Sequence, residues 1–240
     1  IETIETELML ADLESLEKRA TAQEKKAKGG DKEAKESLDL MQRALVLLRD
    51  GKPARLVERK AEEERAFGML GLMTAKPVLY VCNVEEASAK EGNSLSAEVF
   101  TRAAAEGAKA VVVSAKIESE IAVLPPEEQK DYLEAIDLDE PGLNRVIRAG
   151  YDLLHLVTYF TVGPKEARAW TITRGTKAPA AAGVIHTDFE KGFIRAETIA
   201  YDDYVRNKGE AGARDAGRLR LEGKEYIVQD GDVLHFRFAN

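Results

Sequence analysis

The sequence predicts a chain of three parts, with the fold class α/β plus α+β. The first part is a long helical hairpin, the second alternates strands with helices, and the third consists mainly of short strands. Three observations support this division: apolar stripes that are interrupted at Gly29-Gly30-Asp31, two apolar strands on either side of a helical pattern, and a late series of short alternating segments. We expect the three parts to be residues 1–57, 58–155 and 156–240.

The first part is predicted to be two antiparallel helices joined by a tight turn. Glycines at 29 and 30 permit the reversal, Asp31 can cap the second helix, and Asp50-Gly51-Lys52-Pro53 ends it. Helices of roughly 20 to 26 residues would each extend about 30 to 39 Å. The apolar stripes are Ile1, Ile4, Leu8, Ala11 and Ser15, widened by Leu10, Leu13 and Leu16, in the first helix, and Leu38, Met41, Leu45 and Leu48 in the second.

The second part is predicted to contain two parallel strands. Strands that alternate with helices pair in parallel, and open sheets of this kind bind ligands at the carboxyl ends of their strands. The predicted elements are, in order, a helix at 62–73, a strand at 77–82, a helix at 96–106, a strand at 110–114, and helices at 125–136 and 142–155.

Each of these two strands ends in a short polar motif. The first runs into Asn83-Val84-Glu85-Glu86 and the second into Ser114-Ala115-Lys116. These motifs resemble the purine-binding Asn-Lys-x-Asp and Ser-Ala-Lys motifs of P-loop GTPases of the Ras and Obg kind. The phosphate-binding pattern G-x-x-x-x-G-K-[ST] occurs nowhere in the chain, and the segment that comes nearest, Gly217 to Gly223-Lys224, has the wrong spacing and is followed by Glu225.

The third part is predicted to be a small domain of short strands with one helix near 211–221. Asp230-Gly231-Asp232 is typical of a tight turn, here before the last strand. We expect Trp170 to be a core residue of the sheet. The predicted strands are 157–162, 167–173, 193–199, 226–228 and 233–238.

Long contiguous runs identify a family. The chain resembles the YchF-type Obg-like ATPases over essentially all of its length, beginning partway into the family's nucleotide domain. The resemblance implies a coiled-coil arm, the C-terminal half of a P-loop NTPase α/β domain, and a TGS domain with the ubiquitin-like β-grasp fold. We therefore expect a fragment that lacks the N-terminal P-loop part. The matching runs are 7–13, 25–31, 140–151, 166–171, 186–196 and 230–236.

The family resemblance also implies a function. Intact relatives bind and hydrolyse ATP, bind GTP less well, and associate with ribosomes. ATP and Mg²⁺ are therefore expected for the intact protein, and no tightly bound cofactor for this chain. We expect no catalytic residue among the 240, because those that hold the phosphates and Mg²⁺ precede Ile1 in the family. The chain by itself is expected to be inactive as a hydrolase.

The residues of the first motif favour adenine over guanine. Guanine is selected by a carboxylate that accepts from its N1–H and N2 amine, but Glu86 is one methylene longer than the usual Asp, and Val84 replaces the usual Lys. The second motif points the other way, because its backbone N–H meets guanine O6 in GTPases. GTP therefore stays open as a weaker ligand. The expected base-binding residues are Asn83, Val84, Glu86, Ser114, Ala115 and Lys116.

The tip of the hairpin is basic although the whole chain has a net charge of −8. Lys25, Lys26, Lys28 and Lys32 lie beside the Gly-Gly turn. They are consistent with two interpretations: an ordinary solvated tip, or a finger that contacts RNA phosphates. The second underlies an alternative function, a nucleotide-independent module that binds ribosomal RNA or protein through the arm tip and the TGS domain.

The composition restricts the remaining possibilities. Hydrophobic residues make up 44% and charged residues 32% of the chain, and no apolar run reaches the roughly 18 residues that a membrane span needs. One cysteine, Cys82, excludes an internal disulfide and suits a reducing cytoplasm. The three histidines have no metal-ligand spacing, so no metal site is expected. The oligomeric state is left open.

Overall fold

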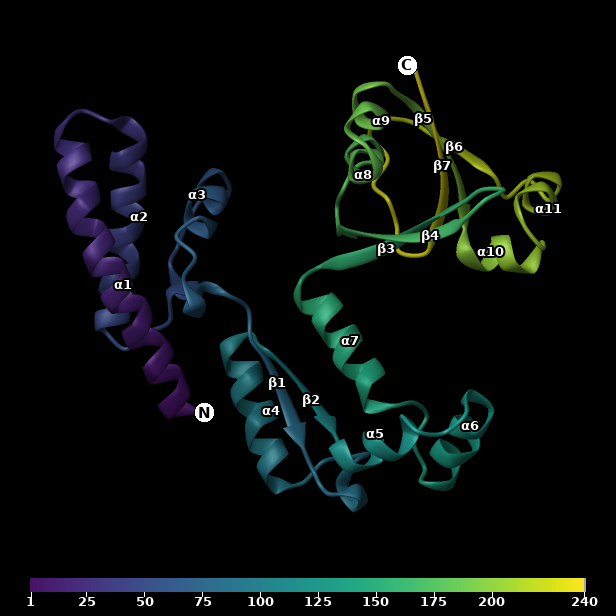
Figure 1. Cartoon of the computed structure of the whole chain (residues 1–240), viewed down its shortest axis with the longest axis horizontal. Coiled ribbons are helices and arrows are strands. Elements are labelled where there is room, and N and C mark those ends of the chain that lie inside the picture. The colour runs from purple at the N-terminus through teal and green to yellow at the C-terminus, as the bar shows by residue number, and fades with distance from the viewer. Residues whose placement is uncertain (240) are drawn as a thin grey trace. The chain divides into compact units, whose positions relative to one another are not determined.

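The computed structural model describes residues 1–239, which form two compact units, residues 1–78 and 79–239 (Figure 1). The first unit is helical and the second combines helices with two sheets. The contact-based boundary places residues 58–78 with the hairpin, whereas the sequence grouped them with the part that follows. The three-part division of the sequence stays a prediction.

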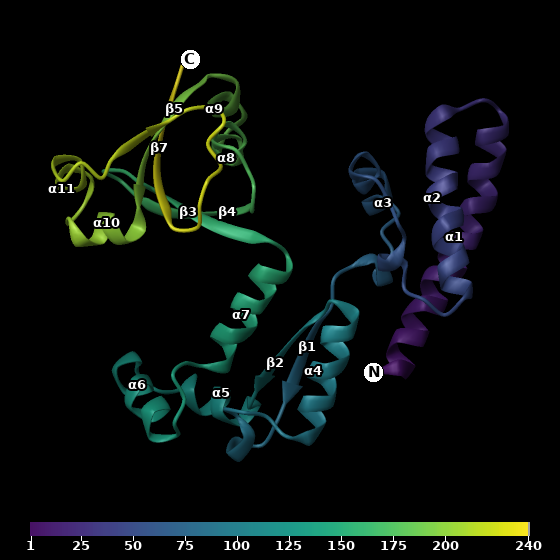
Figure 2. The same cartoon turned by 180° about the vertical axis from the view of Figure 1, so that it is seen from behind.

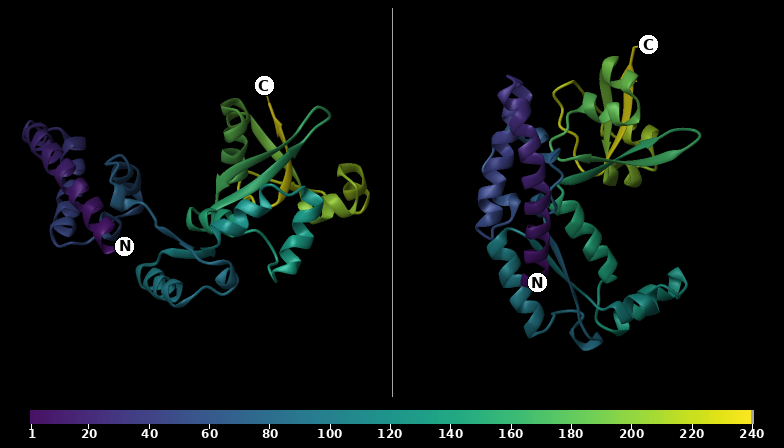
Figure 3. Two further views of the ribbon diagram at one scale, coloured as in Figure 1. Left: turned by 60° about the horizontal axis from the view of Figure 1, so that its bottom comes forward. Right: turned by 60° about the vertical axis from the view of Figure 1, so that its left-hand side comes forward.

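The first unit is built on a helical hairpin, whose two helices lie side by side in every view (Figures 2 and 3). As predicted, the chain reverses at glycines, and Gly30 has φ +94°, a backbone conformation that favours glycine. Asp31 caps the second helix, since its side chain accepts a hydrogen bond from the Ala34 N–H at 3.1 Å. The elements are α1 (Glu2–Lys28), α2 (Lys32–Arg49) and α3 (Glu64–Gly68), with short 3₁₀ turns at Ala54–Leu56, Ala61–Glu63 and Met73–Ala75.

The buried face of α1 agrees with the predicted stripe only in part. Ile1, Ile4, Leu8, Ala11 and Ser15 are all exposed, whereas Leu16 is buried and Leu13 half-buried, as the widened stripe predicted. The other buried residues of α1 are Asp12, Ala20 and Ala27, which were not predicted. Asp12 fixes this rotation, because its carboxylate accepts from the Met73 N–H at 2.9 Å and from the Thr74 N–H and hydroxyl at 2.8 and 2.7 Å. Hydrogen bonds to a buried carboxylate therefore decide which face of α1 turns inward. The spacing of apolar residues alone cannot predict such bonds.

A helix predicted for residues 62–73 is mostly wrong. Only Glu64–Gly68 forms an α-helix, and Gly71, at φ +66°, lies in the loop that follows. Apolar side chains on both sides of this break join the core of the hairpin. That core is made of Leu16, Ala20, Leu40, Met41, Ala44, Leu45, Leu48, Ala54, Val57, Phe67, Leu70 and Leu72. Burial of a side chain such as Leu16, which is 0% exposed, contributes about 1.5–3 kcal/mol.

The second unit begins with the predicted parallel pair of strands. β1 (Leu79–Asn83) and β2 (Lys109–Val113) pair in register from Leu79↔Lys109 to Asn83↔Val113. The helices around them are α4 (Ser94–Glu106), α5 (Ala115–Ile121), α6 (Pro126–Ala135) and α7 (Gly142–Leu153). Helix α5 is absent from the sequence prediction. Its seven residues directly follow β2, so they are too few to show a helical period.

The remainder of this unit is a five-stranded sheet in the order β4-β3-β7-β5-β6. The central strands β3 and β7 are parallel, and the other pairs are antiparallel. The strands are β3 (Leu156–Val162), β4 (Ala167–Thr173), β5 (Phe193–Ala200), β6 (Arg220–Glu222) and β7 (Asp232–Phe238), and the helices are α8 (Ala178–Ile185), α9 (Thr187–Lys191), α10 (Tyr201–Arg206) and α11 (Glu210–Asp215).

Two of the predicted elements in this region are wrong. The helix expected near 211–221 ends at Asp215, because Gly217 has φ +67° and the chain then enters β6. The strand expected at 226–228 is only an isolated bridge between Lys177 and Ile227. Helices α8, α9 and α10 were not predicted, since each is at most eight residues long.

The core of the sheet lies between its strands and α8. Tyr159 is fully buried, and its hydroxyl donates to the Ala181 carbonyl at 2.9 Å. Trp170 packs against this core with its ring 6.5 Å from that of Tyr159, and its Nε1 donates to Thr161 Oγ1. The guanidinium of Arg168 covers the indole ring at 4.0 Å. Trp170 is half-buried, so it packs at the margin of the predicted core and is not one of its fully buried residues.

Candidate nucleotide-base site

The structure brings the two predicted motifs together at one edge of the β1–β2 pair. Asn83 and Val113 are partners at the ends of the strands, and the Val84 N–H donates to the Val113 carbonyl at 2.9 Å. Both chains then turn away at the same edge, because the strands are parallel. The loops that carry the base-binding candidates are therefore neighbours.

Asn83 joins the two loops. Its Oδ1 accepts a hydrogen bond from the Ala115 N–H at 2.9 Å. The residue is exposed, and no group within residues 1–239 accepts a bond from its Nδ2 amine. One end of the Asn83 amide is thus used to hold the loops, while the other retains two donors for a ligand.

The bond to Asn83 also changes the role of Ala115. The sequence suggested that the backbone N–H of the second motif is available to guanine O6. In the structure the Ala115 N–H is already bound by Asn83. The feature that favoured guanine is therefore occupied by a protein acceptor.

Val84 and Ser114 lie beneath the loops. Val84 is 9% exposed, so little of its side chain is available to a base. Ser114 is 2% exposed, and its Oγ has no hydrogen-bond partner. It stands at the N-cap of α5 without capping it. A buried hydroxyl without a partner is unfavourable by about 1–3 kcal/mol, so this atom is a polar group still unsatisfied at the site.

Glu86 and Lys116 form an ion pair between the two loops. The Nζ of Lys116 lies 2.7 Å from Glu86 Oε2. The hydrogen bond that Lys116 donates to Glu86, and then the negative charge of Glu86, raise the pKa of the Lys116 ammonium above its usual value. The carboxylate at position 86, which the sequence predicted to correspond to the guanine-selecting Asp, is therefore paired with a cation of the same chain.

Helix α7 braces both loops through residues that sequence reasoning missed. Glu118 on α5 accepts from the Gly142 N–H at 2.7 Å and from the Leu143 N–H at 3.1 Å. Arg145 donates to the carbonyl of Ala89, in the loop after β1, at 3.2 Å. A carboxylate at a helix N-terminus is favourable, because it meets unsatisfied N–H groups. The only signal in the sequence was the family run at 140–151.

An open depression of about 540 Å³ lies beside the site and includes Glu86 in its lining. Ile117 and Tyr132 contribute to its wall. The Tyr132 hydroxyl donates to Glu120, which raises the pKa of the phenol to about 12. Neither Asn83 nor Ser114 lines the depression, so it adjoins the site without containing it.

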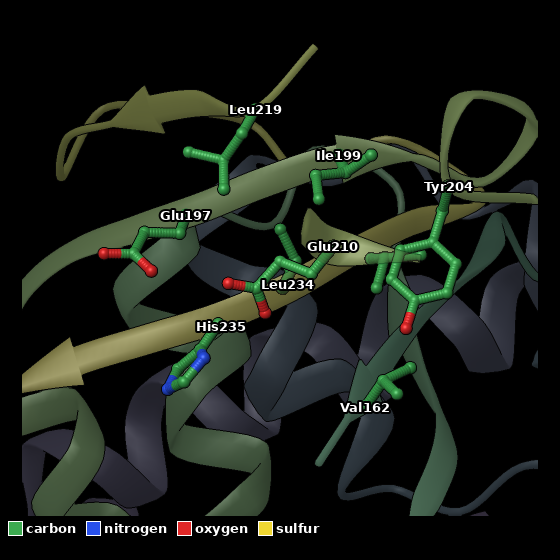
Figure 4. A pocket seen from close by; sticks show the side chains of 9 residues that line it. Val162, Glu197, Ile199, Tyr204, Glu210, Leu219, Leu234 and His235 are labelled. Atoms are coloured by element: carbon green, nitrogen blue, oxygen red, sulfur yellow. The ribbon is translucent and has the colours of Figure 1, made fainter. Parts of the chain in front are cut away.

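A second pocket lies in the sheet region and is shown from close by in Figure 4. Glu197, Glu210 and His235 line it together with apolar side chains. Its volume is about 10 Å³, at the lower limit for a single water molecule. Glu197 is moreover bound by Arg237 at 2.9 Å. This pocket is too small for a nucleotide and is part of the packing of the domain.

The lysines of the hairpin tip are all exposed, in the last turn of α1 and at the start of α2. Lys32 lies 3.9 Å from Glu36, a loose ion pair. Within the described residues, no carboxylate lies within ion-pair distance of Lys25, Lys26 or Lys28. The tip thus presents charges that the rest of its unit does not neutralise.

Within residues 1–239 there is neither a cluster of metal ligands nor a helix suited to crossing a membrane. In that range no group of three or more His, Cys, Asp or Glu side chains is arranged to hold a metal ion. No helix in the described part of the chain is both long and apolar enough to span a membrane. Cys82 is half-buried, and its burial raises the pKa of the thiol.

Comparison with known proteins identifies relatives along the whole chain. A family profile, YchF-GTPase_C, described as "Protein of unknown function (DUF933)", matches residues 156–239. The Ribosome-binding ATPase YchF of Haemophilus influenzae is 55% identical over 238 residues, which are 99% of this chain and 65% of that protein. The protein of the same name from Bacillus subtilis is 51% identical over 240 residues, which are 99% of this chain and 66% of that protein.

A solved structure agrees with these relatives. The YchF GTPase of Schizosaccharomyces pombe superimposes with a TM-score of 0.81 at 32% identity, covering 98% of this chain and 64% of that one. The fold is therefore the mixed α/β type of that protein, with a helical N-terminal arm and separate sheets. The chain belongs to the YchF family, and it spans about 65% of the length of the curated relatives it matches.

Proposed function

We propose that this chain supplies the base-recognition part of an ATP-binding site in a YchF-type ATPase. The base would lie at the two loops that carry the predicted residues Asn83, Val84, Glu86, Ser114, Ala115 and Lys116, with Val84 and Ser114 beneath them. The observation that carries the proposal is the bond from the Ala115 N–H to Asn83 Oδ1, which removes a donor for guanine O6 and leaves the Asn83 amine for the base. Adenine has an N7 acceptor for that amine and needs no donor for an O6 atom.

The phosphates and Mg²⁺ of ATP would be held by residues outside this sequence, since the chain contains no P-loop motif. Phosphoryl transfer depends on such groups for positioning and for charge stabilisation. We infer that the 240 residues alone do not hydrolyse ATP or GTP. We propose GTP as a weaker ligand than ATP for the complete site. We also propose that the protein is located in the cytoplasm.

The test is an NMR titration of the 240-residue chain with AMP and with GMP, followed through the backbone amides of Asn83 and Ala115. AMP is expected to shift both signals at lower concentration than GMP. The Asn83→Ala variant should weaken AMP binding about tenfold, because it removes a hydrogen-bond donor and loosens the joined loops.

The control for this titration is Asn144→Ala, which removes an exposed amide from α7. It should leave AMP binding unchanged. If GMP bound more tightly than AMP, or if AMP shifted neither Asn83 nor Ala115, the assignment of the base site would be wrong.

We also propose a second function, ribosome binding through the hairpin tip and the C-terminal sheet. The unpaired charges of Lys25, Lys26 and Lys28 favour it, together with Lys32. Two relatives are named as ribosome-binding ATPases. The ribosome would be contacted through its RNA phosphates, which bind lysine by a salt-dependent release of counterions.

We assign the third part to the TGS type with a β-grasp fold. Support comes from its mixed five-stranded sheet, in which the first and last strands, β3 and β7, are parallel neighbours at the centre. Helix α8 packs on one face of this sheet through Ala178, Ala181 and Ala182. The hairpin is assigned to the coiled-coil arm, and the β1–β2 part to the C-terminal half of a P-loop NTPase domain.

A further inference from the structure

We propose that Lys116 is a positioning residue that keeps the site from accepting guanine, by holding the carboxylate of Glu86 in an ion pair. This inference rests on the proposed function, since it concerns the same base site. It adds a second determinant of base choice, beyond the longer side chain that Glu86 has in place of the usual Asp.

The ion pair between Glu86 and Lys116 occupies the acceptor that a guanine base would need. Glu86 stands in a 3₁₀ turn after β1, and Lys116 is the second residue of α5, so the pair connects the two loops. Their charged atoms are 2.7 Å apart. A guanine base can use a carboxylate only through its N1–H and N2 amine, and these donors would compete with the ammonium for the same acceptor.

The surroundings of Lys116 explain why it pairs with Glu86. Glu120 lies one helical turn further along α5 and is the other acid that acts on the lysine. Glu120, however, accepts the hydroxyl of Tyr132. Glu86 accepts a hydrogen bond directly from the lysine, so it is the primary partner.

The exposure of the pair determines how large the effect is. The Lys116 and Glu86 side chains are 65% and 47% exposed, so the pair is screened by solvent and is weak. Breaking such a pair should increase the equilibrium fraction of Glu86 carboxylate that is free to bind a base by roughly a factor of three to five. The lysine therefore tunes the base preference, and the protein fold does not depend on it.

The experiment measures AMP and GMP affinities of the 240-residue chain by amide chemical shifts. Lys116→Gln should raise the ratio of GMP affinity to AMP affinity about three- to fivefold. Lys116→Arg retains the ion pair and should behave as the wild type. The double variant Lys116→Gln, Glu86→Gln should lose the gain, because it has no carboxylate to release.

The matched control is Lys90→Gln. Lys90 forms an equally close pair with Asp137, at 2.6 Å, and does not touch Glu86. An unchanged ratio of GMP to AMP affinity in Lys116→Gln, with both ligands still shifting Asn83 and Ala115, would overturn the inference and leave the base site standing. Wild-type amides that respond to neither ligand would overturn the proposed function, and this inference with it. An equal gain in Lys90→Gln would also overturn it, since loss of any positive charge would then suffice.

Discussion

The hairpin tip and the base site both display exposed lysines, but they use the charge in opposite ways. At the tip, Lys25, Lys26 and Lys28 lie on the last helical turn without a carboxylate partner in the described chain. At the base site, Lys116 is paired with Glu86, and neighbouring Lys90 is paired with Asp137. Unpaired charge suits a polyanion of any sequence, whereas paired charge leaves recognition to hydrogen bonds. The position of charge therefore separates the two proposed functions better than the net charge does.

The comparison predicts its largest effect at the tip. Changing Lys25, Lys26, Lys28 and Lys32 together to Gln should weaken ribosome binding by orders of magnitude at low salt, since each lost phosphate contact lowers the salt slope by about 0.9. Co-sedimentation with ribosomes across a salt series measures this.

A control variant changes the net charge by the same amount as the tip variant, but it removes four lysines that form ion pairs. It is Lys52, Lys60, Lys90 and Lys130 to Gln, each of which lies within 4.0 Å of a carboxylate. It should sediment like the wild type. If both quadruple variants lost binding to the same degree, net charge alone would govern the interaction.

The next effect concerns the buried charge of the hairpin unit. Asp12→Ala leaves the Met73 and Thr74 donors without their acceptor, and should reduce the free energy of unfolding by about 2–4 kcal/mol. Denaturant unfolding of the whole chain measures it. Glu14→Ala, which removes only the exposed ion pair of α1 with Lys18, is the control and should change little. Equal loss in the two variants would mean that the Asp12 network does not orient α1.

The smallest expected effect on stability concerns a carboxylate that is ion-paired within the five-stranded sheet, Glu197. Hydrogen bonds from Arg237, chiefly, lower the pKa of its carboxyl. A lowered pKa in the folded state stabilises the fold above the unfolded pKa of about 4.3, and this contribution is lost as pH falls through the folded value. Glu197→Gln should therefore be less stable than the wild type at pH 7, and the difference should shrink below about pH 4.

Urea unfolding at several pH values measures the difference between Glu197→Gln and the wild type. A difference that stayed constant from pH 7 down to about pH 3 would show that the ion pair with Arg237 contributes nothing through its charge.

How much the sequence predicts depends on where each structural signal lies. The strand pair β1–β2 and its motifs are local and strongly apolar, so their positions follow from the sequence within one or two residues. The rotation of α1 does not, because Asp12 is matched to Thr74, sixty-two residues away. The bond between Asn83 and Ala115 likewise depends on parallel strand register, and it occupies the backbone N–H that the second motif was expected to offer to guanine.

The short helices could not be predicted from the sequence for a related reason. Helices α5, α8, α9 and α10 have at most eight residues, which is too short for an apolar period to be recognised. The brace formed by Glu118 and Arg145 was missed because neither residue belongs to a chemical motif. Each is recognised only when its partner across the fold, Gly142 or Ala89, is known.

The bare backbone at Gly142 limits how this region can vary. A methyl group there would lie 2.9 Å from Glu118 Oε1 and 3.0 Å from a methyl of Val113. Alanine at this position would require the Glu118 carboxylate, the far end of a flexible side chain, to move away from the N-terminus of α7, and Val113 to shift by a few tenths of an ångström. The missing side chain at Gly142 is thus what allows α7 to approach β2 and α5 this closely.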